Sequence, residues 1–340
     1  MIVGLEGRGS AGRPEARRPP IEDMARLPHA LRRMGRRATS LPSPAVSTAT
    51  AQGLPGLGRV PPFGLVLSGI TSIQFGAALA ATVFNDLGPA GASALRLTFA
   101  AVMLMVIVRP RVRGRGWPAL RLAGLFGLAL GAMNLTFYEA LDRIPLGIAV
   151  TIEFAGPLGV AVATSRRRLD LVWAALAAAG IVLLSGAGGT GSGGIDPVGL
   201  ALILTAAACW GAYILIAQRA GRIYSGSEGL ALAMVVAALV PLGPGIAQGG
   251  SDLLRPDMLA IGAGIALLSS VIPYSFETEA LRRLPTNVFG VLMSLEPAGA
   301  GIAGFIVLGQ SLGALDLVAM ALVVTASIGV SRTGAAAPEA

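Results

Sequence analysis

The chain of 340 residues is strongly apolar: 54% of its residues are hydrophobic and only 13% are charged. An ordinary soluble domain carries about 25% charged residues, so this composition excludes a water-soluble fold and favours a protein whose solvent is the lipid bilayer. All 26 basic residues are arginines, and they gather in a leading segment and in short loops. The net charge of +8 therefore indicates membrane topology and not a nucleic-acid-binding surface.

The chain contains one cysteine and one histidine. Cys209 alone excludes an internal disulfide and a cysteine metal cluster, and His29 lies in the leading segment. Proton chemistry inside the apolar region would have to use carboxylates. No G-x-x-x-x-G-K-[ST] phosphate loop and no catalytic dyad is visible there. We therefore expect no enzyme activity, no metal site, no cofactor and no ATP drive.

Residues 1–60 differ from the rest, with ten arginines, many Pro, Ser and Gly, and no apolar run. They predict a disordered cytoplasmic tail. Two alternatives stay open: an over-long start with Met24 or Met34 as the true beginning, or a basic arm that touches anionic lipid. Residues 333–340 predict a short disordered C-terminal tail.

Ten apolar segments follow the leading tail. Most approach the length of about 20 residues that crosses a bilayer core. We predict membrane spans at 63–84, 89–108, 119–141, 146–164, 170–187, 198–217, 228–246, 257–279, 286–308 and 313–331. The fifth and seventh segments are short and interrupted by glycine.

The loop arginines predict the orientation. They follow the even-numbered spans, at Arg109, Arg111, Arg113, Arg115, Arg166, Arg167, Arg168, Arg219, Arg222, Arg282, Arg283 and Arg332. The odd-numbered loops hold only Arg143 and Arg255. The positive-inside rule then places both termini in the cytoplasm and requires an even number of spans. We expect a multi-pass protein of the inner or plasma membrane.

The sequence also repeats itself. The motif E-A-L-x-R-x-P occurs at 139–145 and again, 140 residues later, at 279–285; Pro157 and Pro297 match at the same offset. The matches define two repeats, residues 61–188 and 196–332. Because each holds five spans, an odd number, the second enters the membrane from the opposite side. The predicted fold is all-α: ten transmembrane helices in two inverted repeats, an arrangement typical of transporters with a site at the midplane.

Glu153 and Glu296 are carboxylates inside predicted spans, where a charge costs at least roughly 2.5–3.5 kcal/mol. Each precedes a proline, Pro157 or Pro297, that frees a backbone carbonyl. This suits the binding of a proton or a substrate; the alternative is a protonated glutamate that hydrogen-bonds for packing. Glu139 and Glu279 recur in both repeats.

The recurring glutamates predict a scaffold role, as caps or as partners of Arg143 and Arg283, together with Pro145 and Pro285.

Arg96, inside the second span, has Ala233 near its place in the second repeat. It is a candidate to bind a substrate carboxylate or, equally, to pair with a buried glutamate. Asn134 and Tyr138 lie one turn apart on the third span, where Gly127 and Gly131 suit close helix contact. Further polar candidates for a binding site, or for interhelical hydrogen bonds, are Gln74, Tyr213, Tyr274, Glu277 and Ser294.

Several segments resemble the drug/metabolite transporter superfamily, whose repeat is the EamA domain, and within it the threonine/homoserine exporters of the RhtA type. The resemblance runs from about Pro61 to Arg332. It is carried by SIQFGAA at 72–78, ALRL at 94–97, GAMN at 131–134, RIPLGIAV at 143–150, IEF-x-GPL at 152–158, SS-x-IPYS at 269–275 and LMSLEP at 292–297. Gln310 departs from the family, which commonly has an acid at this place.

The resemblance implies export of small metabolites, with threonine and homoserine as leading substrates, driven by proton entry. Arg96 would bind the amino acid carboxylate, and Glu153, Glu277 or Glu296 would meet the ammonium group or carry the proton. The partners would be a small-molecule substrate and the bilayer, not nucleic acid, and a homodimer is left open. Alternatives are another substrate of the superfamily, such as a drug-like amine or purine, or a non-transporting membrane enzyme or sensor.

Overall fold

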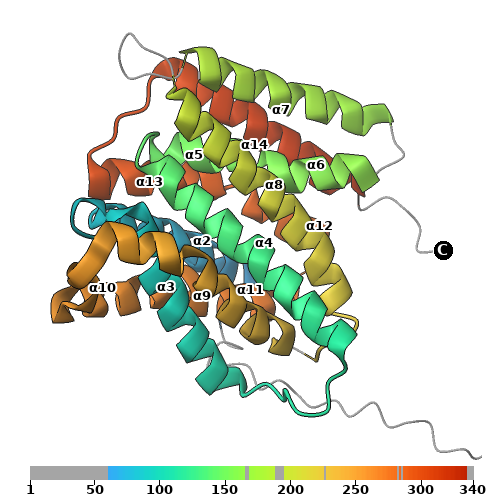
Figure 1. Ribbon diagram of the computed structural model, residues 1–340. Coiled ribbons are helices and arrows are strands. Elements are labelled where there is room, and N and C mark those ends of the chain that lie inside the picture. The colour runs from blue at the N-terminus through green and yellow to red at the C-terminus, as the bar shows by residue number, and fades with distance from the viewer. Residues whose placement is uncertain are drawn as a thin grey trace, which may run out of the picture. The chain divides into compact units, whose positions relative to one another are not determined.

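The computed structural model describes residues 60–164, 168–187, 195–225, 227–281, 283–284 and 286–334, and this part of the chain contains helices and no strands. The predicted leading tail up to residue 59, Pro285 and residues 335–340 lie outside the described residues. The helices of the first half (residues 61–188) are α2 (Pro62–Ala81), α3 (Phe84–Val108), α4 (Trp117–Leu141), α5 (Leu146–Glu153), α6 (Ala155–Thr164) and α7 (Arg168–Ala187) (Figure 1).

The second half (residues 196–332) repeats this order with more interruptions. Its elements are α8 (Pro197–Ala220), α9 (Glu228–Gly249), the 3-10 turn η3 (Gly250–Leu254), α10 (Pro256–Ala266), the π-helical turn η4 (Leu267–Val271), α11 (Ile272–Leu281), α12 (Thr286–Met293), α13 (Glu296–Leu308) and α14 (Ala314–Gly334).

Each of the ten predicted spans coincides with a helix or with a pair of consecutive helices. Nine helices in the described residues are long and apolar enough to cross a membrane, which confirms an all-helical, multi-pass membrane protein. The apolar part of α7, Leu169–Leu184, is shorter than the others. The count of ten spans stays a prediction.

Two spans are broken near their middle. The break between α5 and α6 falls at Phe154, and the break between α12 and α13 falls at Ser294 and Leu295. In each case a proline follows within three residues, Pro157 or Pro297. Because proline has no N–H and clashes with the preceding turn, it favours a break in the helix at this place. The breaks place Glu153 at the end of α5 and Glu296 at the start of α13.

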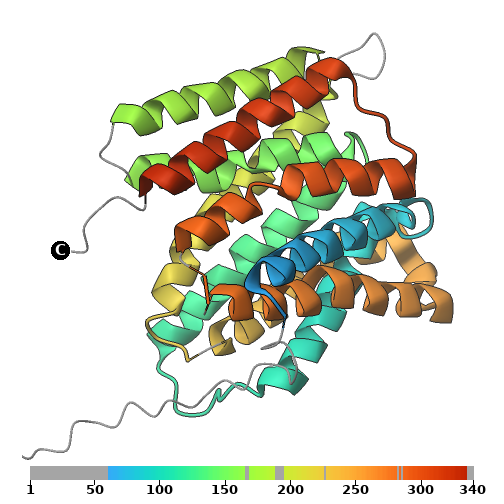
Figure 2. The ribbon, with the colours of Figure 1, turned by 180° about the vertical axis from the view of Figure 1, so that it is seen from behind.

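The most extensive helix packing joins the two halves. α3 packs along α9, α4 lies against both α8 and α9, and α7 lies beside α14. Figures 1 and 2 show α7 and α14 side by side from both directions. On the other side of the molecule α2 packs against α11 and α13. The core of the protein is therefore built between the halves and not inside either of them.

Small residues permit the close contact of α4 with α9. A Cβ atom placed on Gly131 would lie 2.6 Å from the carbonyl oxygen of Ala237, and one on Gly127 would overlap the carbonyl of Ala233. The prediction that these two glycines serve close helix contact is confirmed.

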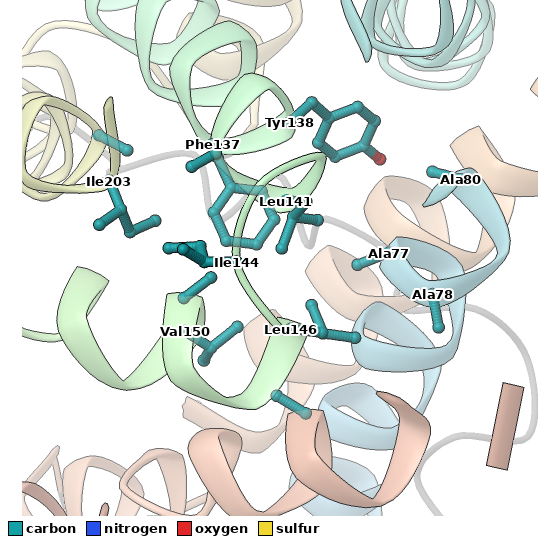
Figure 3. Close-up of a cluster of buried hydrophobic side chains, with 14 of the residues drawn as sticks. Ala77, Ala78, Ala80, Phe137, Tyr138, Leu141, Ile144, Leu146, Val150 and Ile203 are labelled. Carbon is teal, nitrogen blue, oxygen red and sulfur yellow. The ribbon is translucent and has the colours of Figure 1, made fainter. Parts of the chain in front are cut away.

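The largest apolar cluster gathers at the ends of the helices where α2 meets α3 and α4 meets α5. Figure 3 shows part of it: Phe137, Tyr138 and Leu141 from α4, Leu146 and Val150 from α5, Ala77, Ala78 and Ala80 from α2, and Ile203 from α8. We call this set, with the other buried residues of the same cluster such as Phe84 and Met258, the main apolar cluster.

Candidate functional site

A cavity of about 370 Å³ lies between the two halves. This volume is at the lower end of the roughly 300–1,000 Å³ found for small-molecule sites. First-half helices α2 to α6 and second-half helices α8, α11, α12, α13 and α14 all contribute to its wall. The predicted site residues in the wall are Gln74, Arg96, Asn134, Glu153, Pro157, Tyr213, Tyr274, Glu277 and Glu296.

Arg96 is the positively charged residue of the cavity wall. It lies at the middle of α3 and is only 6% exposed. Its Nη1 donates to the hydroxyl of Tyr138 at 3.2 Å and its Nη2 donates to the carbonyl of Ser269 at 3.1 Å. The guanidinium carbon also lies 5.5 Å from the centre of the Tyr138 ring, within cation–π range. These contacts fix the side chain while it faces the cavity.

No carboxylate lies within ion-pair distance of Arg96 in the part of the chain that the structure describes. Its Nε is buried and has no hydrogen-bond partner there. A buried cation normally has a charged partner because desolvation is costly. Arg96 therefore keeps N–H groups that can donate to a carboxylate ligand. The geometry does not show the alternative, a direct ion pair between Arg96 and a buried glutamate.

Three glutamates line the same cavity. Glu153 and Glu296 are 8% and 6% exposed, and each sits at one of the two helix breaks. Glu277 comes from α11. None of the three has a hydrogen-bond partner among the described residues, in contrast with Arg96. Carboxylates without fixed partners are free to bind a proton or an ammonium group.

Two predicted binding residues lie outside the cavity wall. Tyr138 is fully buried, and its role in the structure is to hold Arg96. Ser294 is also fully buried and hydrogen-bonds to Ser327 at 2.7 Å. Asn134 does line the cavity, although its amide nitrogen donates to the carbonyl of Leu130 on its own helix.

The predicted scaffold residues form contacts near the helix ends. Glu279 pairs with Arg283 at 3.3 Å, as expected for one member of the repeat. Glu139 does not pair with Arg143 in the described structure: it accepts a hydrogen bond from Gln248, and Arg143 lies 3.6 Å from Asp196. The two equivalent glutamates therefore have different partners, because Gln248 and Asp196 reach the first-half motif from the second half.

The scaffold proline Pro145 directly precedes α5, where it sets the extended backbone before the first turn.

Sequence reasoning missed the apolar and hydroxyl parts of the wall. They include Phe137, Phe154, Trp210, Met293, Ser327 and Ser331. Phe154 and Trp210 make an edge-to-face contact with 5.3 Å between ring centres. Two signals are present in the sequence. Trp210-Gly211 repeats Phe75-Gly76 of the first half, and Ser327 and Ser331 are four residues apart on one helix face. Neither signal distinguishes a cavity wall from ordinary packing.

The comparisons with known proteins agree with this geometry. The model of the EamA-like transporter family matches residues 197–332. The threonine/homoserine exporters RhtA of Salmonella typhimurium (strain SL1344) and Escherichia coli (strain K12) are each 41% identical over 273 residues, which is 80% of this chain and 92% of theirs.

A solved crystal structure shares the fold, with a TM-score of 0.54 and 19% identity over 79% of this chain and 96% of the other. The resemblance found in the sequence motifs is confirmed by these matches. With the multi-pass helical fold and a mostly apolar cavity between its halves that is lined by one arginine and three glutamates, the chain belongs to the EamA-like transporter family, in the group of the RhtA exporters, and is an exporter of small metabolites.

Proposed function

We propose that the protein exports small zwitterionic amino acids, with threonine and homoserine as the leading substrates, in exchange for protons. The observation that carries this proposal is the pairing of unlike charges in one cavity: the fixed guanidinium of Arg96 and the unpartnered carboxylates of Glu153, Glu277 and Glu296. A zwitterion needs an acceptor for its ammonium group and a donor for its carboxylate. The names of the RhtA relatives point to the same substrates.

The charge of the cavity wall supports proton coupling. One arginine and three glutamates line it, so full ionisation leaves two surplus negative charges, and a zwitterion adds none. Uncompensated charge at membrane depth is costly. Protons that bind the glutamates remove the surplus negative charge. The uptake and release of these protons would then be part of the transport cycle.

The helix packing supports the inverted-repeat arrangement. α3 packs on α9, α5 on α13 and α7 on α14, and each of these contacts joins a predicted span to its predicted counterpart in the other repeat. The contact of α4 with α8 is matched by that of α2 with α11. A two-fold relation between the repeats produces this pattern. We infer ten spans with both termini in the cytoplasm of a cell whose inner or plasma membrane holds the protein.

With the proposed orientation, we infer a state in which the cavity opens toward the cytoplasm. The cavity reaches Ala161, Phe289 and Ser331, which lie near the arginine-flanked ends of α6, α12 and α14. The main apolar cluster fills the opposite end of the helices. Alternating access then consists of separating that cluster while the cytoplasmic end closes.

The direct test uses purified protein in vesicles loaded with labelled L-threonine or L-homoserine. We expect substrate efflux that accelerates when a proton gradient drives protons inward against it. Protein with Arg96→Gln is the control for efflux through the cavity, and its flux should fall to the level of loaded vesicles that contain no protein. Absence of flux for every member of an amino acid panel, with flux of an amine or purine instead, would replace the proposed substrate class.

A further inference from the structure

The span formed by α10 and α11 is interrupted by the π-helical turn η4, and Pro273 lies two residues after the end of this turn. Pro273 lies four residues after Ser269 and five residues after Leu268. An α-helical bond to the Ser269 carbonyl and a π-helical bond to the Leu268 carbonyl would both need an N–H on residue 273. Proline has none. π-Turns inside helices occur frequently at functional sites.

The two carbonyls that Pro273 leaves without this partner accept hydrogen bonds from the first half. Ser72 of α2 donates its hydroxyl to the Leu268 carbonyl at 2.7 Å. Arg96 of α3 donates from Nη2 to the Ser269 carbonyl at 3.1 Å. The Arg96 bond is buried and the Ser72 bond is partly buried, and an unsatisfied carbonyl inside a membrane span is costly. The interruption in this second-half span thus provides two carbonyl acceptors for side chains of the first half.

We propose that Pro273 is a positioning residue for substrate recognition: by freeing the Ser269 carbonyl it gives Arg96 its second anchor and aims the guanidinium at the cavity. The inference rests on the proposed function for the identity of the ligand, an amino acid carboxylate. Arginine has five N–H donors, and the anchors at Ser269 and Tyr138 use two of them, so donors remain for the ligand. An arginine held in advance loses less side-chain entropy on binding, which raises affinity for the anion.

The test compares two probes, L-threonine and L-threoninol, in which the carboxylate is replaced by a hydroxymethyl group. Pro273→Ala restores the N–H in a residue that favours helix, so the Ser269 carbonyl can bond within its own helix. We expect the ratio of threonine to threoninol affinity to fall about tenfold, as for the loss of one charge-assisted hydrogen bond. Threoninol affinity should stay unchanged, because this probe does not use the carboxylate contact.

Two further variants make the result specific. Pro244→Ala is the matched control, since Pro244 is also inside a helix, α9, but is exposed and absent from the cavity wall; it should keep the wild-type ratio. Tyr138→Phe removes the other anchor and should lower the ratio in the same way as Pro273→Ala. If Pro273→Ala keeps the wild-type ratio while Arg96→Gln loses it, Pro273 does not position Arg96 and the inference is overturned.

A ligand-free measurement separates this inference from the proposed function. Thermal unfolding in detergent is measured for Arg96→Met, Pro273→Ala and the double variant. Because both substitutions break the same hydrogen bond, their effects on Tm should depart from additivity by about 2 °C or more. Additive effects would overturn the inference whatever the protein transports. If the effects on Tm are coupled but the protein does not discriminate between threonine and threoninol, Pro273 still positions Arg96. The proposed amino acid substrate is then rejected.

Discussion

Arg96 and the three glutamates of the cavity are held in different ways, and the difference separates their roles. Arg96 is tied to Tyr138 and to the Ser269 carbonyl, so its guanidinium is held in place, as the proposed binding of a substrate carboxylate requires. Glu153 and Glu296 have no hydrogen-bond partner among the described residues and sit at breaks in their helices. A carboxylate that changes its protonation during transport needs this freedom, because a fixed partner would favour one of its two forms.

Glu153→Gln and Glu296→Gln should each lower proton-driven efflux at least about tenfold, because an amide keeps the shape of the side chain but cannot carry the proton. The measurement is efflux from vesicles with an imposed proton gradient, at equal protein content. Exchange of labelled for unlabelled substrate without a gradient should persist in a variant that has lost only the proton site.

The matched control for the carboxylates is Glu139→Gln. Glu139 is hydrogen-bonded to Gln248 and absent from the cavity wall, so this variant should retain proton-driven flux. Wild-type behaviour of both Glu153→Gln and Glu296→Gln would show that neither carboxylate carries the proton.

At the scale of helices, the contact of α4 with α9 and the starts of α3 and α5 depend on a few small or polar residues. Gln248 accepts a hydrogen bond from the amide of Ala90 at 2.8 Å, and Gln310 accepts one from the amide of Leu146 at 3.0 Å. Each glutamine belongs to the second half and satisfies an N–H of the first half, after the kink at Gly88 in α3 or at the start of α5. Gln310, the departure from the family's usual acid, therefore has a definite structural role.

Gly131→Ala should lower Tm by several degrees, while Gly124→Ala on the same helix should leave it unchanged or raise it slightly. A Cβ on Gly131 meets the Ala237 carbonyl at 2.6 Å, whereas one on Gly124 meets nothing within 4 Å. Overpacking costs about 1–3 kcal/mol, and Gly→Ala at a free helix position gains about 0.5–1 kcal/mol. Thermal unfolding in detergent measures both. Equal shifts for the two variants would mean that α4 and α9 do not pack this closely.

Gln310→Ala should destabilise the protein by about 1–3 kcal/mol, the cost of leaving the Leu146 amide unsatisfied. Gln310→Glu should retain stability, because a carboxylate also accepts from this amide and interacts favourably with a helix N-terminus. Gln218→Ala, at an exposed position on α8, is the control and should be neutral. The prediction fails if Gln310→Ala and Gln218→Ala unfold at the same temperature.

At the scale of the whole molecule, polar contacts join the halves at the end where the main apolar cluster lies. Arg143 pairs with Asp196 at 3.6 Å, and Arg255 pairs with Asp86 at 3.4 Å. In the proposed alternating-access mechanism, these contacts and the two glutamine bonds would break when that end opens. Exposed ion pairs contribute only about 0–1 kcal/mol each, so the apolar cluster would supply most of the closure.

Single cysteines test both the topology and the state of the cavity. In a Cys209→Ala background, Arg113→Cys and Ser331→Cys should react with a membrane-impermeant maleimide from the cytoplasmic side. Ser251→Cys, at an exposed position of η3, should react from outside. Labelling of Ser251→Cys from the cytoplasm would overturn the orientation. Labelling of Ser331→Cys only from outside would mean that the cavity opens in the opposite direction.

The helices themselves follow from the sequence, because a run of about 20 apolar residues has no other stable structure in a bilayer. The breaks follow only in part: Pro157 and Pro297 mark two of them within three residues, but Pro241 and Pro244 lie inside α9 without breaking it. The sequence does not show which face of each helix lines the cavity. In a membrane both the lipid-facing and the buried sides are apolar, so hydropathy has no contrast that would reveal Trp210 or Ser327 as cavity residues. The position of Tyr138 along its helix could not show that its hydroxyl accepts a hydrogen bond from Arg96.

By itself the sequence determined that the protein crosses a membrane many times, that it resembles the exporters, and that Arg96 and a few glutamates are its buried charges. Only the tertiary structure decided which of these meet. The Ser269 carbonyl is freed by Pro273, a local fact, but its partner is 173 residues away in the other half. Such a contact depends on how two helices pack, and packing between apolar helices is governed by close contact of small residues and by scarce polar bonds that no local pattern records.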